Sequence, residues 1–400
     1  SIKLASTTLI QAGFCESNPM AACGDEGFQS LVIDHGSAMI KAGYAGDDAP
    51  HSVFPSIVGL PIQPELHGMR ANAWFAGDEA ASKRGILRLN SPIERGVVTN
   101  FDDLDRLWHQ TFYRELGVVP EEHSMLLIEP LLNPRENRER TAQLMFETYS
   151  GPALFLACDA VLAMYASGRA SGLSITLGAD KLDCVAVYEG HAMPHTATRL
   201  EVGGRQLDNH LMKLLTECGY SFTCGGEREL VRDIKEKLCY VALDYEQELK
   251  HAASSSEREK TYELPDGQEI RLGAELFRCT EALFRPSLLG LLDAPSIQQC
   301  AYNSVLRADV TIRDHLLRAC PVVLSGGPSM FAGIAERLRS ELGALAGGDI
   351  RPLVSAPLDH KYSAWIGGSI LASLSSFQNG WISREEYDEY GPSLVHVRCF

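Results

Sequence analysis

Two short turns carry the residue types that could bind a phosphate chain. The first is Asp34-His35-Gly36-Ser37-Ala38, in a predicted β-hairpin over 31–46, and the second is Gly178-Ala179-Asp180, in a predicted hairpin over 171–190. Backbone N–H groups that converge in a tight turn can bind anions, so two equivalent turns could clamp a phosphate chain between them. The chemistry of the chain therefore depends on whether both turns keep the residues that this binding requires.

The elements around these hairpins alternate between strands and helices, which predicts an α/β fold with helices packed on sheets. Short apolar runs predict strands at 125–129, 153–157 and 321–325. Apolar residues at helical spacing predict helices at 100–112, from 133 onward, and at 159–167, 206–218, 227–247, 276–284, 297–304 and 334–345. Asn100 is the expected N-cap of the first helix. Asp266-Gly267 predicts a third hairpin, and the prolines and glycines of 55–78 predict a loop-rich segment.

The composition excludes several classes of protein. Of the 400 residues, 45% are apolar and 22% are charged, which is typical of a globular protein. The formal charge of −16 argues against direct nucleic-acid binding, and no apolar run is long enough for a membrane span. The 11 cysteines include no CxxC pair, which favours reduced thiols in the cytosol or nucleus. We expect residues 1–28 to form an extension with no signal peptide.

Several long stretches match one protein family almost residue for residue. They include Ala42–Pro50, Val53–Gly59, Ser82–Leu87, Asp233–Leu243, Trp365–Leu374 and Glu386–Pro392. From about Leu31 to Phe400 the chain resembles actin and the actin-related proteins. The resemblance implies an α/β, actin-like fold, in which two RNase H-like α/β domains surround a cleft that binds ATP or ADP with Mg²⁺.

The resemblance also implies the domain boundaries. The first lobe would comprise residues 29–166 plus 363–400, with a small subdomain inserted at 55–91. The second lobe would comprise 167–362, with a subdomain inserted at 203–291. Residues 1–28 precede both lobes.

The first turn is similar to the phosphate loop of actins, Asp-Asn-Gly-Ser-Gly. The matching residues, which the resemblance implies bind the nucleotide, are Asp34, Gly36, Ser37 and Lys41. Asp34 is also the candidate on the metal side. Ala38 carries a methyl group where actins have glycine, which can obstruct a close backbone approach. We expect His35 to fill space, although it could instead be a new ligand.

The second turn departs much further from the family sequence Asp-Ser-Gly-Asp-Gly-Val-Thr-His, and only Gly178 matches as a cofactor-binding residue. Thr176 stands where actins have the Asp that holds the metal, and it supplies a neutral oxygen where a hard cation favours carboxylate. Asp180 replaces a glycine that faces the terminal phosphate. Asp183 and Asp159 replace the His and Gln that order the attacking water. With these replacements, no catalytic residue of the family is intact. Because phosphoryl transfer depends on positioning and charge compensation, we expect a severe loss of ATP hydrolysis.

The three aspartates admit a second interpretation. Asp159, Asp180 and Asp183 could form a new metal site. We expect instead that they are chance acidic substitutions in a cleft that is no longer held to bind a triphosphate.

The residues that resemble the adenine-binding side are better kept. They are Lys235, Glu236, Gly326, Gly327, Met330 and Lys361. Pro328 departs from the family and removes a backbone donor from this loop. We therefore expect binding of a nucleotide to be weakened less than its hydrolysis.

The surfaces that actins use for assembly are partly kept. The loop at 60–76 shares little with the family, and Arg95 replaces a histidine. The apolar loop 284–293 contains Leu288, Leu289, Leu291 and Leu292, for which a contact surface and core burial are equal alternatives. The groove for partner helices keeps Tyr165, Gly168, Leu371 and Leu374, with Gly380 where actins have a methionine. Cys399 is expected to be exposed.

These features predict a divergent actin-like structural subunit whose ATP hydrolysis is lost or strongly reduced, a pseudo-ATPase. Its expected partners are actin or actin-like subunits and cytoskeletal assembly proteins, with no membrane and no direct nucleic-acid contact. The expected location is the cytoplasm and cytoskeleton, with a ciliary or nuclear assembly as alternatives. The main rival is a conventional ATP-hydrolysing actin that polymerises. A remoter one is a sugar-kinase or chaperone-type ATPase on the same fold.

Overall fold

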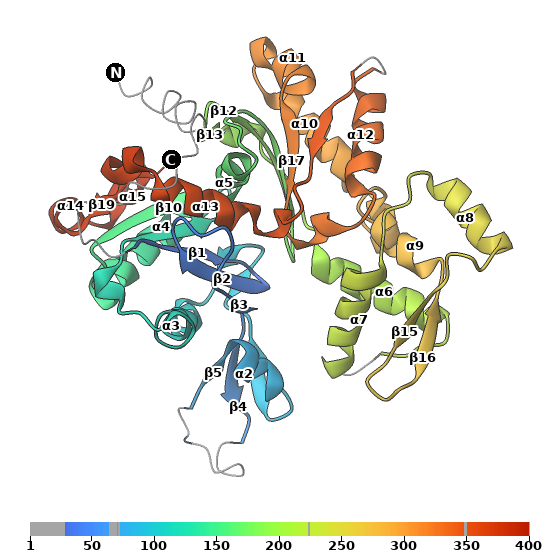
Figure 1. Cartoon of the computed structure of the whole chain (residues 1–400), viewed down its shortest axis with the longest axis horizontal. Coiled ribbons are helices and arrows are strands. Elements are labelled where there is room, and N and C mark those ends of the chain that lie inside the picture. The colour runs from blue at the N-terminus through green and yellow to red at the C-terminus, as the bar shows by residue number, and fades with distance from the viewer. Residues whose placement is uncertain (1–28, 64–69, 71–72, 223–224, 348–349, 400) are drawn as a thin grey trace. The chain divides into compact units, whose positions relative to one another are not determined.

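A computed structural model describes residues 29–63, 70, 73–222, 225–347 and 350–399. The expected extension over 1–28, and part of the loop at 60–76, lie outside these residues. The chain forms two compact units (Figure 1). Of the described residues, the first unit comprises those within 29–171, 187–194 and 362–399, and the second comprises those within 172–186 and 195–361. Among the described residues, no helix is long and apolar enough to cross a membrane.

The first unit is built on a six-stranded mixed sheet with the order β19-β10-β9-β1-β2-β3. Strands β1 (Leu31–His35), β2 (Met39–Tyr44) and β3 (Ser52–Pro55) are antiparallel, whereas β9 (Met125–Glu129) and β10 (Ala153–Cys158) run parallel to β1. Strand β19 (Ile382–Ser383) closes the edge beside β10. The hairpin predicted at 31–46 and the strands predicted at 125–129 and 153–157 are confirmed.

Both faces of this sheet are covered, as alternation along β1 requires. Leu31 and Ile33 pack in one apolar cluster with Trp108, while Val32 packs in the other with Trp365. The covering helices are α3 (Phe101–Gln110), α4 (Arg135–Gln143), α5 (Asp159–Ala166) and α13 (Ser363–Ser373). Two π-helical turns, η2 (Thr111–Leu116) and η4 (Leu144–Thr148), continue α3 and α4. Asn100 caps α3 by accepting from two backbone N–H groups, as predicted.

Helices α5 and α13 cross at very short range. A Cβ atom on Gly367 would lie 1.9 Å from the carbonyl oxygen of Leu162, so only glycine fits there. The Trp365 indole N–H donates to the Val32 carbonyl oxygen at 3.0 Å and ties α13 to the sheet. The motif Trp-Ile-Gly-Gly is therefore a packing requirement of this unit.

The segment expected to be loop-rich at 55–78 is more ordered than predicted. Strands β4 (Val58–Pro61), β5 (Phe75–Ala76) and β6 (Leu87–Asn90) form a small antiparallel sheet next to α2 (Gly77–Ser82). The short strands β7 (Ile93–Glu94) and β8 (Val97–Val98) follow. Among the described residues, Pro55 and Pro61 are the last residues of β3 and β4, where proline is tolerated, so the proline signal was misleading.

The C-terminal segment is anchored, and the expectation that Cys399 is exposed is wrong. This segment contains η9 (Ser375–Gly380), α14 (Arg384–Tyr390), η10 (Pro392–Leu394) and α15 (Val395–Arg398). Cys399 is buried, its sulfur accepts from the Leu156 N–H at 3.3 Å, and Arg138 donates to its carbonyl oxygen at 2.6 Å. Burial raises the pKa of this thiol to about 12, so it stays protonated at neutral pH.

The second unit has its own mixed sheet. Strand β11 (Gly172–Leu177) lies between β12 (Leu182–Tyr188) and β17 (Pro321–Ser325), and β18 (Leu353–Ser355) runs parallel to β17. Strand β14 (Thr198–Leu200) pairs with the beginning of β12. Strand β13 (His191–Ala192) pairs with Val187 and Tyr188 at the end of β12, and these residues are assigned to the first unit. The hairpin predicted at 171–190 is confirmed as β11 and β12.

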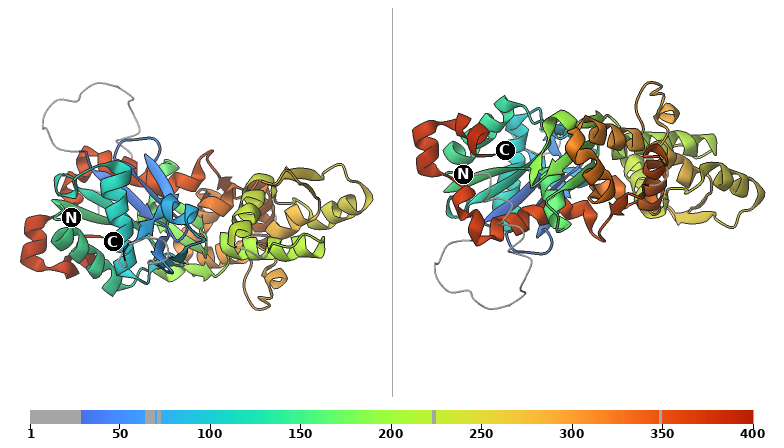
Figure 2. Two further views of the ribbon diagram at one scale, coloured as in Figure 1. Left: turned by 90° about the horizontal axis from the view of Figure 1, so that it is seen from below. Right: turned by 90° about the horizontal axis from the view of Figure 1, so that it is seen from above.

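The helices of the second unit are α6 (Gly204–Glu217), α7 (Gly225–Leu238), α8 (Tyr245–Ser254), α9 (Glu275–Glu281), α10 (Ile297–Arg307), α11 (Val310–Arg318) and α12 (Ile334–Leu345). Figure 2 shows them from two further directions. The predicted third hairpin is confirmed as β15 (Lys260–Glu263) and β16 (Glu269–Leu272). Four short 3₁₀ turns lie in the connections. Two of them cross the boundaries between the units, η5 (Pro194–Thr196) and η8 (His360–Tyr362), and two lie within the second unit, η6 (Pro286–Leu289) and η7 (Gly327–Met330).

The single helix predicted at 227–247 is wrong. Helix α7 ends at Leu238, and a β-bridge between Tyr240 and Ala332 interrupts the helical path. Asp244 then caps α8 by accepting from the Gln247 N–H at 3.0 Å. The apolar residues keep helical spacing on both sides of the break. The sequence pattern therefore gave no sign of the bridge to Ala332 that ends α7. Helix α11, capped by Asp309, was missed altogether.

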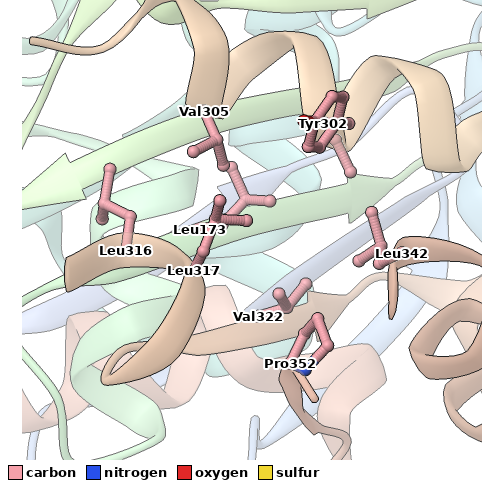
Figure 3. A pocket seen from close by; sticks show the side chains of 9 residues that line it. Leu173, Tyr302, Val305, Leu316, Leu317, Val322, Leu342 and Pro352 are labelled. Carbon is pink, nitrogen blue, oxygen red and sulfur yellow. The ribbon is translucent and has the colours of Figure 1, made fainter. Parts of the chain in front are cut away.

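A small apolar cavity lies between the sheet and three helices of this unit. Its volume is about 10 Å³, room for one water molecule at most. Figure 3 shows side chains from β11, β17, α10, α11 and α12 converging on it. The lining residues are Leu173, Ala301, Tyr302, Val305, Leu316, Leu317, Val322, Leu342 and Pro352.

Enlarging this cavity is expected to be costly. Leu316→Ala should lower the free energy of unfolding by about 3 kcal/mol, because Leu316 is buried and the wall already has a void beside it. Leu306→Ala, at a 42% exposed position on α10, should cost less than about 1 kcal/mol. Urea unfolding followed by circular dichroism measures both values, and equal losses would contradict the packing described.

Candidate functional site

The first turn, between β1 and β2, is held by an ion pair. Gly36 donates its N–H to the Met39 carbonyl oxygen at 3.1 Å and closes the turn. Asp34 and Lys41 face each other across the two strands, and Lys41 Nζ lies 2.6 Å from Asp34 Oδ2. The Asp34 carboxylate is therefore already neutralised by a cation of the same hairpin.

Two further side chains of this turn point to local partners. The Ser37 hydroxyl oxygen accepts the Gly96 N–H at 2.8 Å. His35 is buried and lies edge-on to Trp108, with ring centroids 6.1 Å apart. Burial lowers the pKa of His35, so the ring is neutral. His35 fills space in the core of the first unit, as the space-filling interpretation predicts.

The second turn, between β11 and β12, contains a buried ion cluster. Gly178 donates its N–H to the Lys181 carbonyl oxygen at 2.8 Å. The Lys181 ammonium group pairs with the Asp183 carboxylate, and both side chains are buried. Arg199 on β14 adds a bidentate pair, with Nε 2.6 Å from Asp183 Oδ1 and Nη2 3.1 Å from Oδ2. Asp183 is therefore held by two cations within its own sheet.

The same turn is docked on the beginning of α6. Gly204 donates its N–H to the Gly178 carbonyl oxygen at 3.1 Å, and Arg205 donates its N–H to that of Ala179 at 2.8 Å. A Cβ atom on Gly203 would lie 2.6 Å from the Ala179 carbonyl, so the approach requires glycine. The first N–H groups of a helix are the ones that commonly bind phosphate. Here, two of those groups are engaged by carbonyl oxygens of the turn.

The remaining acidic candidates are engaged separately. Asp180 pairs with Arg205 at 3.3 Å. Asp159 belongs to the first unit, where its Oδ1 accepts the Ala160 N–H at 2.7 Å at the start of α5. Thr176 lies opposite Ser325 in the sheet, and their hydroxyl groups are 3.1 Å apart. Among the residues that the structure describes, no group of three acidic, His or Cys side chains is arranged to hold a metal ion.

The loop after β17 is shaped by a close backbone approach. Gly326 has φ +92°, and a Cβ atom there would lie 2.0 Å from the Leu177 carbonyl oxygen. Its N–H donates to the His360 carbonyl oxygen at 3.2 Å, and the His360 ring contacts the Ser329 carbonyl oxygen at 2.8 Å. This brings the loop that contains Gly327 and Met330 beside Lys361.

The two candidate residues on α7, Lys235 and Glu236, differ in burial and in their partners. Lys235 is buried, with Nζ 2.6 Å from Asp208 Oδ1 and 3.1 Å from the Gly204 carbonyl oxygen. Glu236 is exposed and pairs with Arg232 at 3.1 Å. A methyl group on Gly204 would lie 3.4 Å from both Lys235 Nζ and Pro328, so α6, α7 and the glycine loop meet at this point.

Sequence reasoning missed four residues that position these groups. Asp208 holds Lys235, His360 holds the glycine loop, and Lys181 and Arg199 hold Asp183. The alternation of β12 was a usable signal for Lys181 and Asp183, because residues two apart on a strand share a face. No local signal identified Arg199, His360 or Asp208.

The actin family model matches residues 25–400. The chain belongs to the actin family. The α/β fold with several mixed sheets is accordingly actin-like, and the resemblance from which that fold was expected is confirmed.

Actin-family proteins generally bind ATP or ADP with Mg²⁺, and the second turn of this chain does not fit the metal and phosphate end of that ligand. Thr176 offers no carboxylate, and Asp180 brings a negative charge into the second turn. The turn carbonyls and Asp183 are satisfied within the protein.

The assembly surfaces of the actin-like chain show one clear result. Leu288, Leu291 and Leu292 are exposed by 42%, 38% and 82%, which favours a contact surface over core burial. In the first unit, Tyr165 and Leu371 pack against the cluster that contains Trp365. The Phe377 ring lies 2.7 Å from where a Cβ atom on Gly380 would be, so the space freed by glycine is filled.

The glycine loop gives a paired prediction. Gly326→Ala should lower the free energy of unfolding by at least about 2 kcal/mol, because alanine is strained at this φ and its methyl group collides with Leu177. Gly327→Ala meets no atom within 4 Å and should change it by less than about 0.5 kcal/mol. Urea unfolding of the two variants in parallel tests the difference, and similar values would refute it.

Proposed function

We propose that this actin-family chain is a structural subunit of a filament or fixed protein assembly and that it does not hydrolyse ATP at a useful rate. The observation that carries the proposal is the state of the second turn. The Gly178 N–H is bonded to the Lys181 carbonyl oxygen, and two N–H groups at the start of α6 are bonded to carbonyl oxygens of the turn. Asp183 is paired with Lys181 and Arg199. A turn that is satisfied in this way offers little to a metal-bound phosphate chain.

The loss would be cumulative. Phosphoryl transfer in this fold requires a carboxylate near the metal and polar groups that orient water. Thr176 supplies no carboxylate at the metal position, and Asp183 and Asp159 stand where the His and Gln that order water are expected. Asp34 and Ser37 remain, but they lie on the first unit and are engaged with Lys41 and Gly96. In this proposal the residues expected to bind the cofactor serve as a structural framework and not as a site for a metal-bound triphosphate.

The proposed partners are actin or actin-like subunits and cytoskeletal assembly proteins. Support comes from the exposed leucines at 288, 291 and 292, next to the turn η6. We place the chain in the cytoplasm as part of the cytoskeleton, with a ciliary or nuclear assembly as the alternative setting.

The second candidate is a conventional actin that binds and hydrolyses ATP and polymerises. The intact shape of the glycine loop favours it, because Gly326 and its contact with His360 are kept. The altered second turn weighs against it.

Phosphate release separates the two candidates. The purified chain with Mg-ATP should release phosphate at least about 100-fold more slowly than a conventional actin in the same assay, because several charge-stabilising groups are replaced. A parallel sample with a metal chelator gives the background. Metal-dependent turnover close to that of the conventional actin would overturn the proposal.

Co-sedimentation tests the assembly role. The chain should pellet with preformed actin-type filaments, and Leu292→Asp should weaken this binding by about tenfold, because it places a charge in an apolar contact. Leu358→Asp is the matched control, at a 93% exposed leucine in another loop, and should bind as the wild type does. Equal binding by all three proteins would exclude the loop 284–293 as the contact.

A further inference from the structure

The second turn contains a buried cluster of charged side chains. Lys181, Asp183 and Arg199 form it, and the side chains of Lys181 and Asp183 are only 7% and 4% exposed. Arg199 is 31% exposed and lies directly opposite Asp183 across β12 and β14. All three residues belong to the second unit, so the cluster is complete within it.

The register of the strands explains how the cluster forms. Lys181 and Asp183 are two residues apart, so their side chains share one face where β12 begins. Arg199 reaches the same carboxylate from the neighbouring strand with a two-pronged geometry that fits both oxygens. The carboxylate is thereby bound on one side by an ammonium group and on the other by a guanidinium group.

The energetics of burial make the lysine decisive. A buried ammonium group without a partner is strongly unfavourable, and a buried pair loses much stability when only one partner is removed. The cluster carries two positive charges and one negative charge, so the turn holds its own excess cation. The neighbouring pair of Asp180 with Arg205 adds no net charge.

We propose that the Lys181 ammonium group is a built-in cation that fixes the second turn, so that the stability of the protein depends on this residue and not on a bound metal or nucleotide. The inference rests on the proposed function and deepens it by stating which group stabilises the second turn. It makes the conformation of the turn constant, since the cation is covalently part of the chain and cannot dissociate.

Three variants of the full-length chain test this role by thermal unfolding. Lys181→Met should lower the melting temperature by about 5 to 10 °C, because Asp183 loses the more deeply buried of its two cations and keeps only Arg199, which is 31% exposed. Lys181→Arg keeps the charge and should recover more than half of that loss. Lys237→Met removes a lysine that is 64% exposed and paired on the surface of α7, and it should shift the melting temperature by less than about 1 °C.

A double variant distinguishes the ion pair from general packing. Lys181→Met with Asp183→Leu removes both buried charges and leaves Arg199 able to reach water. Its loss of melting temperature should be smaller than the sum of the losses of Lys181→Met and Asp183→Leu measured singly, as expected for two coupled sites. Additive losses would show that the pair is not the source of the effect.

The wild-type protein provides a test that requires no variant. Its melting temperature should change by less than about 1 °C among a metal chelator, Mg²⁺ alone and Mg-ATP, since a ligand that is not bound cannot stabilise the folded state. A rise of several degrees in Mg-ATP would overturn the inference, as would a Lys181→Met variant as stable as the Lys237→Met control.

The phosphate-release assay keeps the two proposals separable. If the wild type hydrolyses ATP, the proposed function fails whatever the melting temperatures are. If it does not hydrolyse ATP but Lys181→Met is as stable as the control, only the built-in cation is refuted.

Discussion

The hydrogen bonds between the second turn and the start of α6 are the constraint on which the second unit depends. The carbonyl oxygens of Gly178 and Ala179 cap the helix, and this fixes Gly204 against Lys235 and Pro328. A helix start needs acceptors for its free N–H groups, and the turn provides two of them. The hairpin, two helices and the glycine loop are thereby held in one arrangement.

The acidic and basic residues around this point then fall into place. Asp208 fixes Lys235, Arg205 meets Asp180, and Asp183 is enclosed by its two cations. Each charge within this group has a partner in the same unit, which is the usual requirement for burying charge. These ion pairs form a network within the unit, whereas at a bound nucleotide part of the charge compensation comes from the ligand.

The sequence was a good guide wherever the signal was local. Apolar alternation located both hairpins, Asn100 located the start of α3, and Asp266-Gly267 located the β15–β16 turn. It failed where a distant contact decided the outcome. The bridge between Tyr240 and Ala332 ends α7 within a continuous helical pattern, and the pocket that buries Cys399 is made by β10 and Arg138. The replaced residues at 176, 180 and 183 were visible in the sequence, but two of the partners that satisfy Asp183 and Lys235, Arg199 and Asp208, lie on other elements.

A subunit whose cation is part of the polypeptide would have no ligand state that changes with time after assembly. In an assembly whose subunits exchange or hydrolyse a ligand, the age of each subunit is recorded in what it still holds. Lys181 cannot be spent or replaced, so old and newly added copies of this chain would be chemically identical. Growth and disassembly would then respond to concentration and to partner proteins alone. This behaviour suits a permanent component of an assembly, whose state does not change with time.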